Sequence, residues 1–424
     1  MAQAEVIARM SDLAASSPFR SSRELKARLH RVERRHRLVS LGLAAPLVLF
    51  LIVFFVLPIL QMLAAAWYDR SVIDSMPRTA AAIQQWDGSN LPGEPVYEAI
   101  ARDLAEARAD RTLAVVARRM NQELLGARSL FLRSPGQLPD ETPASWRDAM
   151  LEIDERWGDR EHLVTLQRAA RPLTGFYMLS ALDMERNVDG SVAMQPPGQR
   201  LYLQLIGRTL NIAFSVTAIC LVMGFPIALL LAHTGGMVRN VLLVLVLLPF
   251  WTSLLVRTAA WIVVLQNEGI VNTGLVSLGL LDEPVRLIYN RFGVLIVMSQ
   301  VLLPFMILPL YAVMSGISQS HMRAALSLGG RPWFAFRRVY LPQTLPGIAA
   351  GTLLVFMLSI GYYITPALVG GSDDQMLSYF IAFYANETIN WGLAAALGTV
   401  LMVIVLVLFA IYSRVFGIDR IRVN

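Results

Sequence analysis

Cysteine and lysine are nearly absent from this 424-residue sequence, which contains one of each, Cys220 and Lys26. A single cysteine excludes an intrachain disulfide and a zinc-type cysteine cluster. Lys26 does not follow the glycine-rich loop that holds nucleotide phosphates, so this chain is not its own P-loop ATPase. Packing, rather than disulfides, must therefore hold the chain together.

Soluble character is also lacking. Hydrophobic residues make up 55% of the chain and the mean hydropathy is +0.51, which is too apolar for a soluble globular protein. The formal net charge is +6, yet residues 69–200 contain 16 Arg against 20 Asp and Glu, or −4, which leaves +10 for the rest. This distribution predicts a multi-pass membrane protein with basic cytoplasmic flanks, and it argues against a nucleic-acid site.

Six apolar runs are long enough to cross a hydrocarbon core about 30 Å thick. An even number of spans places both termini on the same side, and the basic flanks place them in the cytoplasm of a bacterial inner membrane. The first run lacks a signal-peptidase site, so we expect it to remain as an anchor. The predicted spans are Leu38–Trp67, Thr209–Ala232, Asn240–Gln266, Phe292–Gly316, Pro342–Pro366 and Thr388–Ser413.

The chain is therefore expected to be an all-α polytopic protein with a large helical periplasmic insertion between its first two spans. The predicted parts are a basic cytoplasmic arm (1–37), a first transmembrane helix (38–67), a periplasmic helical domain (68–200), a five-helix transmembrane core (201–416) and a cytoplasmic tail (417–424).

Helical spacing predicts the structure of the insertion. Val96, Ile100 and Leu104 recur every fourth residue, and the series Trp146, Met150, Ile153 and Trp157 repeats at four, three and four. Two roles remain open for this domain. It caps the pathway and helps to seat a solute-binding protein, or it is a structural insertion without solute contact.

A charged, proline-containing stretch from His321 to Gly347 interrupts two long apolar runs. It contains four arginines and no acidic residue, which places it in the cytoplasm. Gly329 is suited to a left-handed helix end and Pro332 to the first turn of a second helix, so we predict a helix-turn-helix elbow. An ordinary amphipathic cytoplasmic loop is the alternative.

The spacing of this elbow resembles the EAA loop of permease subunits of binding-protein-dependent ABC importers: Ala324-Ala325, three residues, Gly329, nine residues, then Val339 to Pro342. In that family the loop forms a coupling helix that docks on a separate ATPase. The family usually carries Glu where this chain has Arg323. The resemblance implies a coupling loop over 317–342, with coupling residues Arg323, Ala324, Ala325, Gly329, Pro332, Leu341 and Pro342.

Two further segments resemble the spermidine/putrescine-type branch of these permeases. The third span contains Trp251, Thr252, Ser253 and Arg257, and Trp261 is positioned to stack on the Arg257 guanidinium. A buried arginine is costly in lipid, so Arg257 faces a pathway, braces a neighbouring helix or extends to the interface.

The fifth span contains Tyr362, Tyr363 and Thr365, with Pro366 expected to break the helix near the outer face. Members of this branch commonly carry an acidic residue where this chain has Tyr362. The tyrosines are candidates for cation–π contact with a solute, or they simply pack in the core.

The resemblance implies a permease subunit that binds no cofactor or metal and is not an enzyme. ATP and Mg²⁺ would be used by a partner ATPase dimer. The expected partners are that dimer, a second permease subunit, a periplasmic solute-binding protein and membrane lipid, with no nucleic acid. A polyamine is the leading solute, and an opine or amino-acid derivative is the alternative. An ion-coupled secondary transporter lacks support because neither inverted repeats nor intramembrane carboxylates are visible. A membrane sensor would need a cytoplasmic signalling domain, for which no cytoplasmic segment is long enough.

Overall fold

The computed structural model describes residue 40 and residues 42–416, which divide into two compact units between Met62 and Leu63. The predicted arm (1–37) and tail (417–424) lie outside the described residues. In the first unit, residues 42–62 are helical and all their side chains are exposed; they include the π-helical turn η1 (Ile52–Val56) and the start of α3 (Leu57–Ala64). A helix that is apolar on all sides requires lipid or another protein around it.

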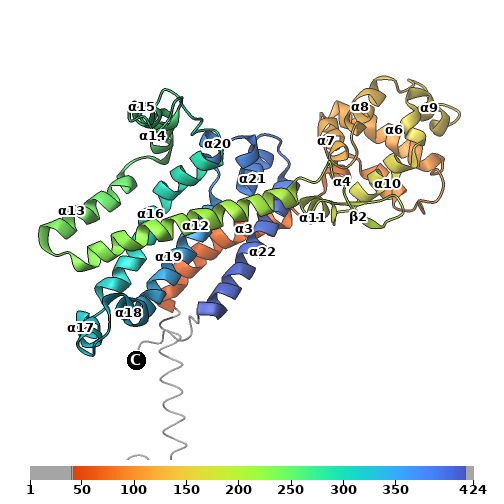
Figure 1. Ribbon diagram of the computed structural model, residues 1–424. Coiled ribbons are helices and arrows are strands. Elements are labelled where there is room, and N and C mark those ends of the chain that lie inside the picture. The colour runs from red at the N-terminus through yellow and green to blue at the C-terminus, as the bar shows by residue number, and fades with distance from the viewer. Residues whose placement is uncertain (1–39, 41, 417–424) are drawn as a thin grey trace, which may run out of the picture. The chain divides into compact units, whose positions relative to one another are not determined.

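The second unit contains the long membrane helices. The helices α12 (Tyr202–His233), α16 (Arg291–Ser315) and α19 (Leu341–Gly361) pack against one another, as Figure 1 shows. Their shared core includes Ile212, Met298 and Leu302. Gly351 allows the closest approach, because a Cβ atom there would lie 2.8 Å from Met306 Sδ. The last helix, α22 (Trp391–Phe416), packs on α19 and on α21 (Leu377–Asn386).

Six helices are long and apolar enough to cross a membrane, which confirms the predicted all-α polytopic fold class. Their bounds all differ from the predicted spans, and the third and fifth differ most. The six candidate spans are Gly42–Ala64, Tyr202–His233, Leu254–Ser277, Arg291–Ser315, Pro332–Gly361 and Trp391–Val415. The third of them combines two shorter helices.

The predicted third span, Asn240–Gln266, is not one helix. It contains α13 (Gly236–Leu247), the 3-10 turn η4 (Leu248–Trp251), an extended break and α14 (Leu254–Leu265), and α15 (Ile270–Ser277) follows. Thr252 and Ser253 are extended, with ψ angles of 142°. Pro249 lacks the amide that would continue the hydrogen-bond ladder, so the helix tightens and then stops.

The fifth span also differs from the prediction. Helix α19 ends at Gly361, Tyr362 is extended, and Pro366 lies inside the short helix α20 (Ile364–Val369) rather than at a break. Proline disturbs the carbonyl four residues before it, which here belongs to Tyr362. The Ser378 hydroxyl donates a 2.6 Å hydrogen bond to that carbonyl. Pro366 therefore correctly indicated a break, but the break lies four residues earlier.

The insertion has a hydrophobic core of its own. Val96, Ile100 and Leu104 are all buried, as their spacing predicted. Helix α9 ends at Ile153, so Trp157 reaches the same core from a 3-10 turn and not from the predicted helical face. The helices and turns are α4 (Ser71–Ser75), α5 (Pro77–Ile83), α6 (Glu94–Ala109), α7 (Leu113–Glu123), α8 (Ala127–Arg133), η2 (Ser134–Gly136), α9 (Trp146–Ile153), η3 (Glu155–Gly158), α10 (Arg160–Ala169) and α11 (Phe176–Ala181).

A small β-hairpin follows, which the sequence patterns did not predict. Strands β1 (Met184–Arg186) and β2 (Val192–Met194) pair antiparallel, with Met184 opposite Met194. Strands of three residues are too short for an alternation to be recognised. Beside the hairpin, α11 packs on α22, and Tyr177, Leu205, Leu377 and Leu397 share a core, so the insertion is joined to the membrane helices by packed side chains.

Candidate functional site

The elbow between α16 and α19 has the predicted helix-turn-helix form. Helix α17 (Gln319–Ser327) ends in a Schellman motif, in which Gly329 N–H donates to Leu326 O at 3.0 Å and Gly330 N–H to Ala325 O at 3.1 Å. Gly329 has a φ of +83°, which confirms its predicted left-handed conformation. Helix α18 (Pro332–Ala335) then begins at Pro332.

Aromatic side chains connect the elbow to the membrane helices. The π-helical turn η5 (Phe336–Tyr340) runs directly into α19, and the His321 ring lies 3.1 Å from Gln343 Oε1. A stacked series begins at the exposed Trp333 and continues inward through Phe336 to Tyr340, with ring centroids 5.8 and 5.7 Å apart. The elbow is therefore packed against the start of α19 and is not an unpacked loop.

The outer surface of the elbow is exposed and carries both apolar and basic side chains. Leu328 is 90% exposed and Trp333 is 72% exposed. The predicted coupling residues Arg323, Ala324, Gly329, Pro332 and Pro342 are exposed, whereas Ala325 and Leu341 are half-buried. Within the described residues Arg323 has no ion pair. This surface is of the kind that packs against a partner.

The predicted pathway residues of the third span lie at the helix break. Trp251, Thr252 and Ser253 are exposed. Arg257 turns back to its own break: its guanidinium donates to Pro249 O and, at 3.0 Å, to Thr252 O. The expected stacking of Trp261 on Arg257 is wrong, since this pair is not among the cation–π contacts of the described residues. The Trp261 indole N–H donates to Gln300 Oε1 at 3.3 Å. Arg257 thus satisfies carbonyls that the break leaves open.

The predicted pathway residues of the fifth span divide into two groups. Tyr362 is half-buried against the membrane core, and Tyr363 is 41% exposed. Thr365 is fully buried, and its hydroxyl has no hydrogen-bond partner among the described residues. Helices α14 and α20 pack together, which brings Arg257 close enough for its charge to act on the Tyr362 side chain. The two helix breaks therefore lie near each other.

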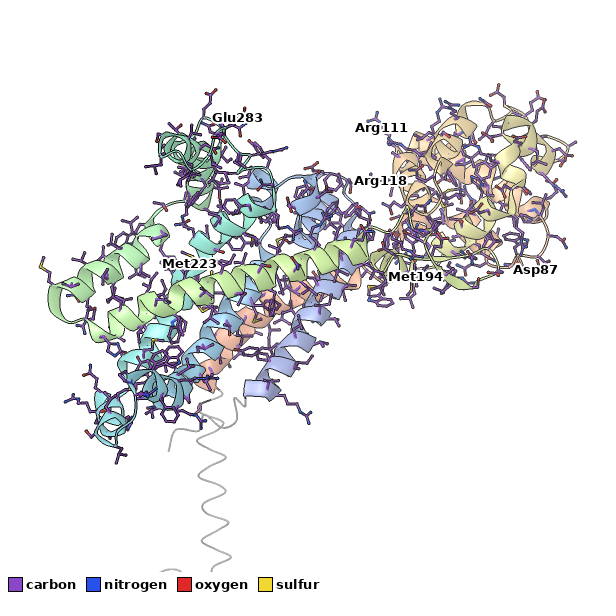
Figure 2. All side chains as sticks on the ribbon, in the orientation of Figure 1. Asp87, Arg111, Arg118, Met194, Met223 and Glu283 are labelled. Atoms are coloured by element: carbon purple, nitrogen blue, oxygen red, sulfur yellow. The ribbon has the colours of Figure 1, made fainter. Side chains whose placement is uncertain are left out.

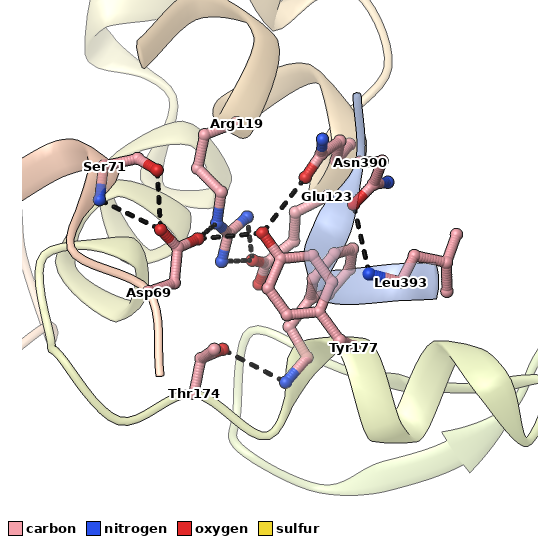
Figure 3. A network of polar contacts seen from close by, with 10 residues as sticks. Asp69, Ser71, Arg119, Glu123, Thr174, Tyr177, Asn390 and Leu393 are labelled. Atoms are coloured by element: carbon pink, nitrogen blue, oxygen red, sulfur yellow. Dashed lines mark hydrogen bonds and ion pairs between the residues drawn. The ribbon is translucent and has the colours of Figure 1, made fainter. Parts of the chain in front are cut away.

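A polar network at the base of the insertion was not predicted from the sequence (Figure 3). Arg119, whose side chain is 3% exposed, donates to Asp69 at 2.6 Å and to Glu123 at 3.2 Å. Asp69 also accepts from the Tyr177 hydroxyl at 2.8 Å. The Tyr177 ring lies directly over Gly392, where an added Cβ would overlap it. Only the i, i+4 spacing of Arg119 and Glu123 is visible in the sequence.

The network controls the ionisation of its members. Burial raises the pKa of Asp69, but hydrogen bonds from Ser71 and the Arg119 charge outweigh burial, so the pKa is lowered overall. Burial, opposed by the Arg119 charge, raises the pKa of the Tyr177 hydroxyl. Asp69 and Arg119 are therefore charged and Tyr177 is neutral at pH 7.

Broken apolar helices and a rigid elbow between two membrane helices define a multi-pass transport component. Residues 224–421 match the family described as "Binding-protein-dependent transport system inner membrane component". The chain belongs to this family, so it is an inner-membrane transport subunit and not an enzyme. The match includes the elbow and both helix breaks and excludes the insertion.

Several known proteins are similar to this chain. The spermidine/putrescine transport system permease protein PotB of Haemophilus influenzae is 36% identical over 214 residues, which is 50% of this chain and 75% of that protein. PotB of Escherichia coli is 33% identical over 214 residues, 50% of this chain and 78% of that protein. A bacterial ABC transporter involved in alginate import aligns with a TM-score of 0.42 and 20% identity, over 52% of this chain and 80% of that chain.

Replacing Arg119 by Met should destabilise the insertion, because Asp69 and Glu123 lose their shared counter-charge. Removing one partner of a buried ion pair typically costs about 3–5 kcal/mol. Thermal unfolding of the purified chain would measure the loss, with Arg128→Met, an exposed arginine of α8, as the matched control.

The pH dependence of the stability loss in Arg119→Met distinguishes a lost ion pair from lost side-chain packing. The lowered pKa of Asp69 means that its stabilisation is complete above its unfolded pKa and is lost as the pH falls through its folded pKa. In Arg119→Met the buried carboxylates lose their counter-charge and are protonated more easily. The difference in unfolding free energy between the parent and the variant should therefore shrink on mild acidification. A constant difference between the two proteins at all pH values would contradict the ion-pair explanation.

Proposed function

We propose that the chain forms the translocation pathway of an ATP-driven importer for a polar, amine-containing solute, with a polyamine such as putrescine or spermidine leading. The observation that carries this proposal is the similarity to the two PotB proteins, which this chain covers over 75% and 78% of their lengths. Tyr362 and Tyr363, at the break after α19, offer aromatic faces to a cation.

One observation favours the alternative solute, an opine or amino-acid derivative. Arg257 places a positive charge near Tyr362, and the helices α12, α14, α16, α19 and α22 contain no Asp or Glu. A bare polycation would meet repulsion there without a compensating carboxylate. A zwitterion could direct its carboxylate to Arg257 and its amine to the tyrosines.

Transport in this proposal requires partners. The exposed elbow residues Leu328, Trp333 and Arg323 support docking of a cytoplasmic ATPase, and two ATPase copies would bind and hydrolyse ATP with Mg²⁺. A second permease subunit would complete the pathway, and a periplasmic solute-binding protein would deliver the solute. Closure of the ATPases would move the elbow, and the spans would then alternate between outward and inward access.

The insertion (69–200) and the elbow are expected on opposite sides of the inner membrane. In a Cys220→Ser background, Leu125→Cys on the insertion should react with a membrane-impermeant maleimide added from the periplasmic side. Leu328→Cys on the elbow should react only after the inner membrane is opened. Both parent side chains are about equally exposed, at 89% and 90%, so accessibility within the fold does not bias the comparison. The reverse pattern would overturn the topology.

Gly329→Val should impair coupling. A β-branched residue at φ +83° is strained by about 1–2 kcal/mol or more, although space around Gly329 is open. Solute-stimulated ATP hydrolysis by the reconstituted complex should fall. The matched control is Gly279→Val, since Gly279 follows the end of α15 with a φ of +69° and equally open space but lies far from the elbow in sequence. Unchanged ATPase co-purification and stimulation in Gly329→Val would refute the coupling role.

Tyr362→Ala should slow uptake several-fold, because cation–π contact contributes about 0.5–2 kcal/mol, provided that the contact forms in the transport barrier. Tyr362→Phe keeps the aromatic face and should retain most of the rate. Solute binding to the partner binding protein should not change. Uptake of labelled putrescine, spermidine and a zwitterionic amine would identify the class, and preferential transport of an amine-free anion or sugar would exclude the proposal.

A further inference from the structure

A cavity of about 340 Å³ lies at the base of the insertion, next to the Arg119 network. Four parts of the chain line it: the segment after the first span, helix α7, Tyr177 of α11 and the residues that begin α22. None of these residues belongs to the elbow or to the helix breaks. The cavity is therefore separate from the proposed transport and coupling sites.

Some charged groups in the cavity wall have hydrogen-bond or ion-pair partners, and others do not. Asp69 accepts four hydrogen bonds: from the Ser71 amide and hydroxyl, from Arg119 and from Tyr177. Arg119 is engaged by Asp69 and Glu123. Each Asp69 carboxylate oxygen therefore accepts two hydrogen bonds, and the Arg119 charge is balanced by two carboxylates.

Arg118 and Asn390 are among the donors of the wall that have no partner in the described chain, together with the Gln122 NH₂ group and the Trp391 indole N–H. The Arg118 side chain, half-buried and lining the cavity, makes no hydrogen bond or ion pair with any described residue. Figure 2 shows Arg118 on the side of the insertion next to the membrane helices. The side-chain amide oxygen of Asn390 accepts a hydrogen bond from Leu393 N–H at 3.2 Å. The side-chain NH₂ group of Asn390 has no partner in the described chain. These free groups are all donors, and Arg118 is cationic, so the complementary ligand is an anion.

The lining residues indicate where the cavity lies along the membrane normal. Ala65 and Tyr68 come directly after the span that ends at Ala64, and Trp391 is the first residue of the last span. Both spans therefore enter the polar region of the bilayer at this cavity. Tyr and Trp are the residues typical of the membrane–water interface.

We propose that this cavity binds the phosphate of a phospholipid in the leaflet on the side of the insertion. The Arg118 guanidinium and the Asn390 amide hold the phosphate oxygens. Ala65, Val115 and Ile389 add apolar wall, which suits the glycerol and upper acyl region of a lipid. Free phosphate shares the polar chemistry but gains nothing from that wall. The amine solute proposed above is not attracted to Arg118, so this inference does not depend on the transported solute.

The test uses the full-length chain, purified and delipidated in detergent, with its thermal unfolding followed by tryptophan fluorescence. Dioleoyl phosphatidylglycerol should raise the unfolding midpoint in a saturable way. Dioleoylglycerol, which has the same chains without phosphate, should not. Glycerol 3-phosphate and inorganic phosphate should be at least about ten-fold weaker than the lipid.

Two variants and one control complete the test. Arg118→Ala should weaken the apparent affinity for phosphatidylglycerol about ten-fold or more, as expected for a lost charge-assisted contact. Asn390→Asp keeps the oxygen that accepts from Leu393, introduces a charge that repels phosphate, and should weaken binding similarly. Arg128→Ala removes an exposed arginine elsewhere on the insertion and should bind as the parent does. Equal stabilisation by dioleoylglycerol, unchanged affinity in Arg118→Ala and Asn390→Asp, or phosphate binding as tightly as the lipid would each overturn the proposal.

Discussion

Every backbone carbonyl and amide in the bilayer core must be satisfied inside the protein, and the membrane part of this chain depends on how it meets that requirement. Two apolar segments leave helical geometry, at Thr252–Ser253 and at Tyr362–Tyr363. At the first break the Arg257 guanidinium satisfies two carbonyls, and at the second the Ser378 hydroxyl satisfies the Tyr362 carbonyl. Because lipid cannot solvate such breaks, they must face protein or water, which is where a pathway is expected.

The sequence was sufficient to predict the number of apolar helices, the elbow and a break in the fifth span, but neither the break in the third span nor the exact position of the break in the fifth. Length and hydropathy identify a span, yet they do not separate one continuous helix from two short ones joined by extended residues. No break was predicted in the third span, whereas Pro366 indicated one in the fifth. Its position depended on a tertiary contact from Ser378, which lies on another segment and leaves no local signal.

Within the insertion, helical periodicity predicted the buried face of α6 correctly, because that face repeats over several turns. The same reasoning misassigned Trp157 by extending a helix through Asp154, whose extended backbone ends it. The buried network was invisible for a further reason: Arg119 and Tyr177 follow Asp69 by 50 and 108 residues along the chain. Nothing in their local sequences distinguishes an arginine that is 3% exposed from the many exposed arginines around it.

The elbow and the second break are the two ends of one helical segment, Pro332–Gly361. It is 30 residues long, so its ends are roughly 45 Å apart. The aromatic series from Trp333 to Tyr340 stiffens its first turns, and the following turns are packed closely on α16. In the proposed coupling role, a displacement of the elbow would be carried along this segment until the helical hydrogen bonds stop. They stop at Tyr362, where extended backbone can change its φ and ψ angles while α20 stays packed on α14 and α16. In our proposal, the force from the ATPase and the aromatic contact with the solute thus meet at the same residue.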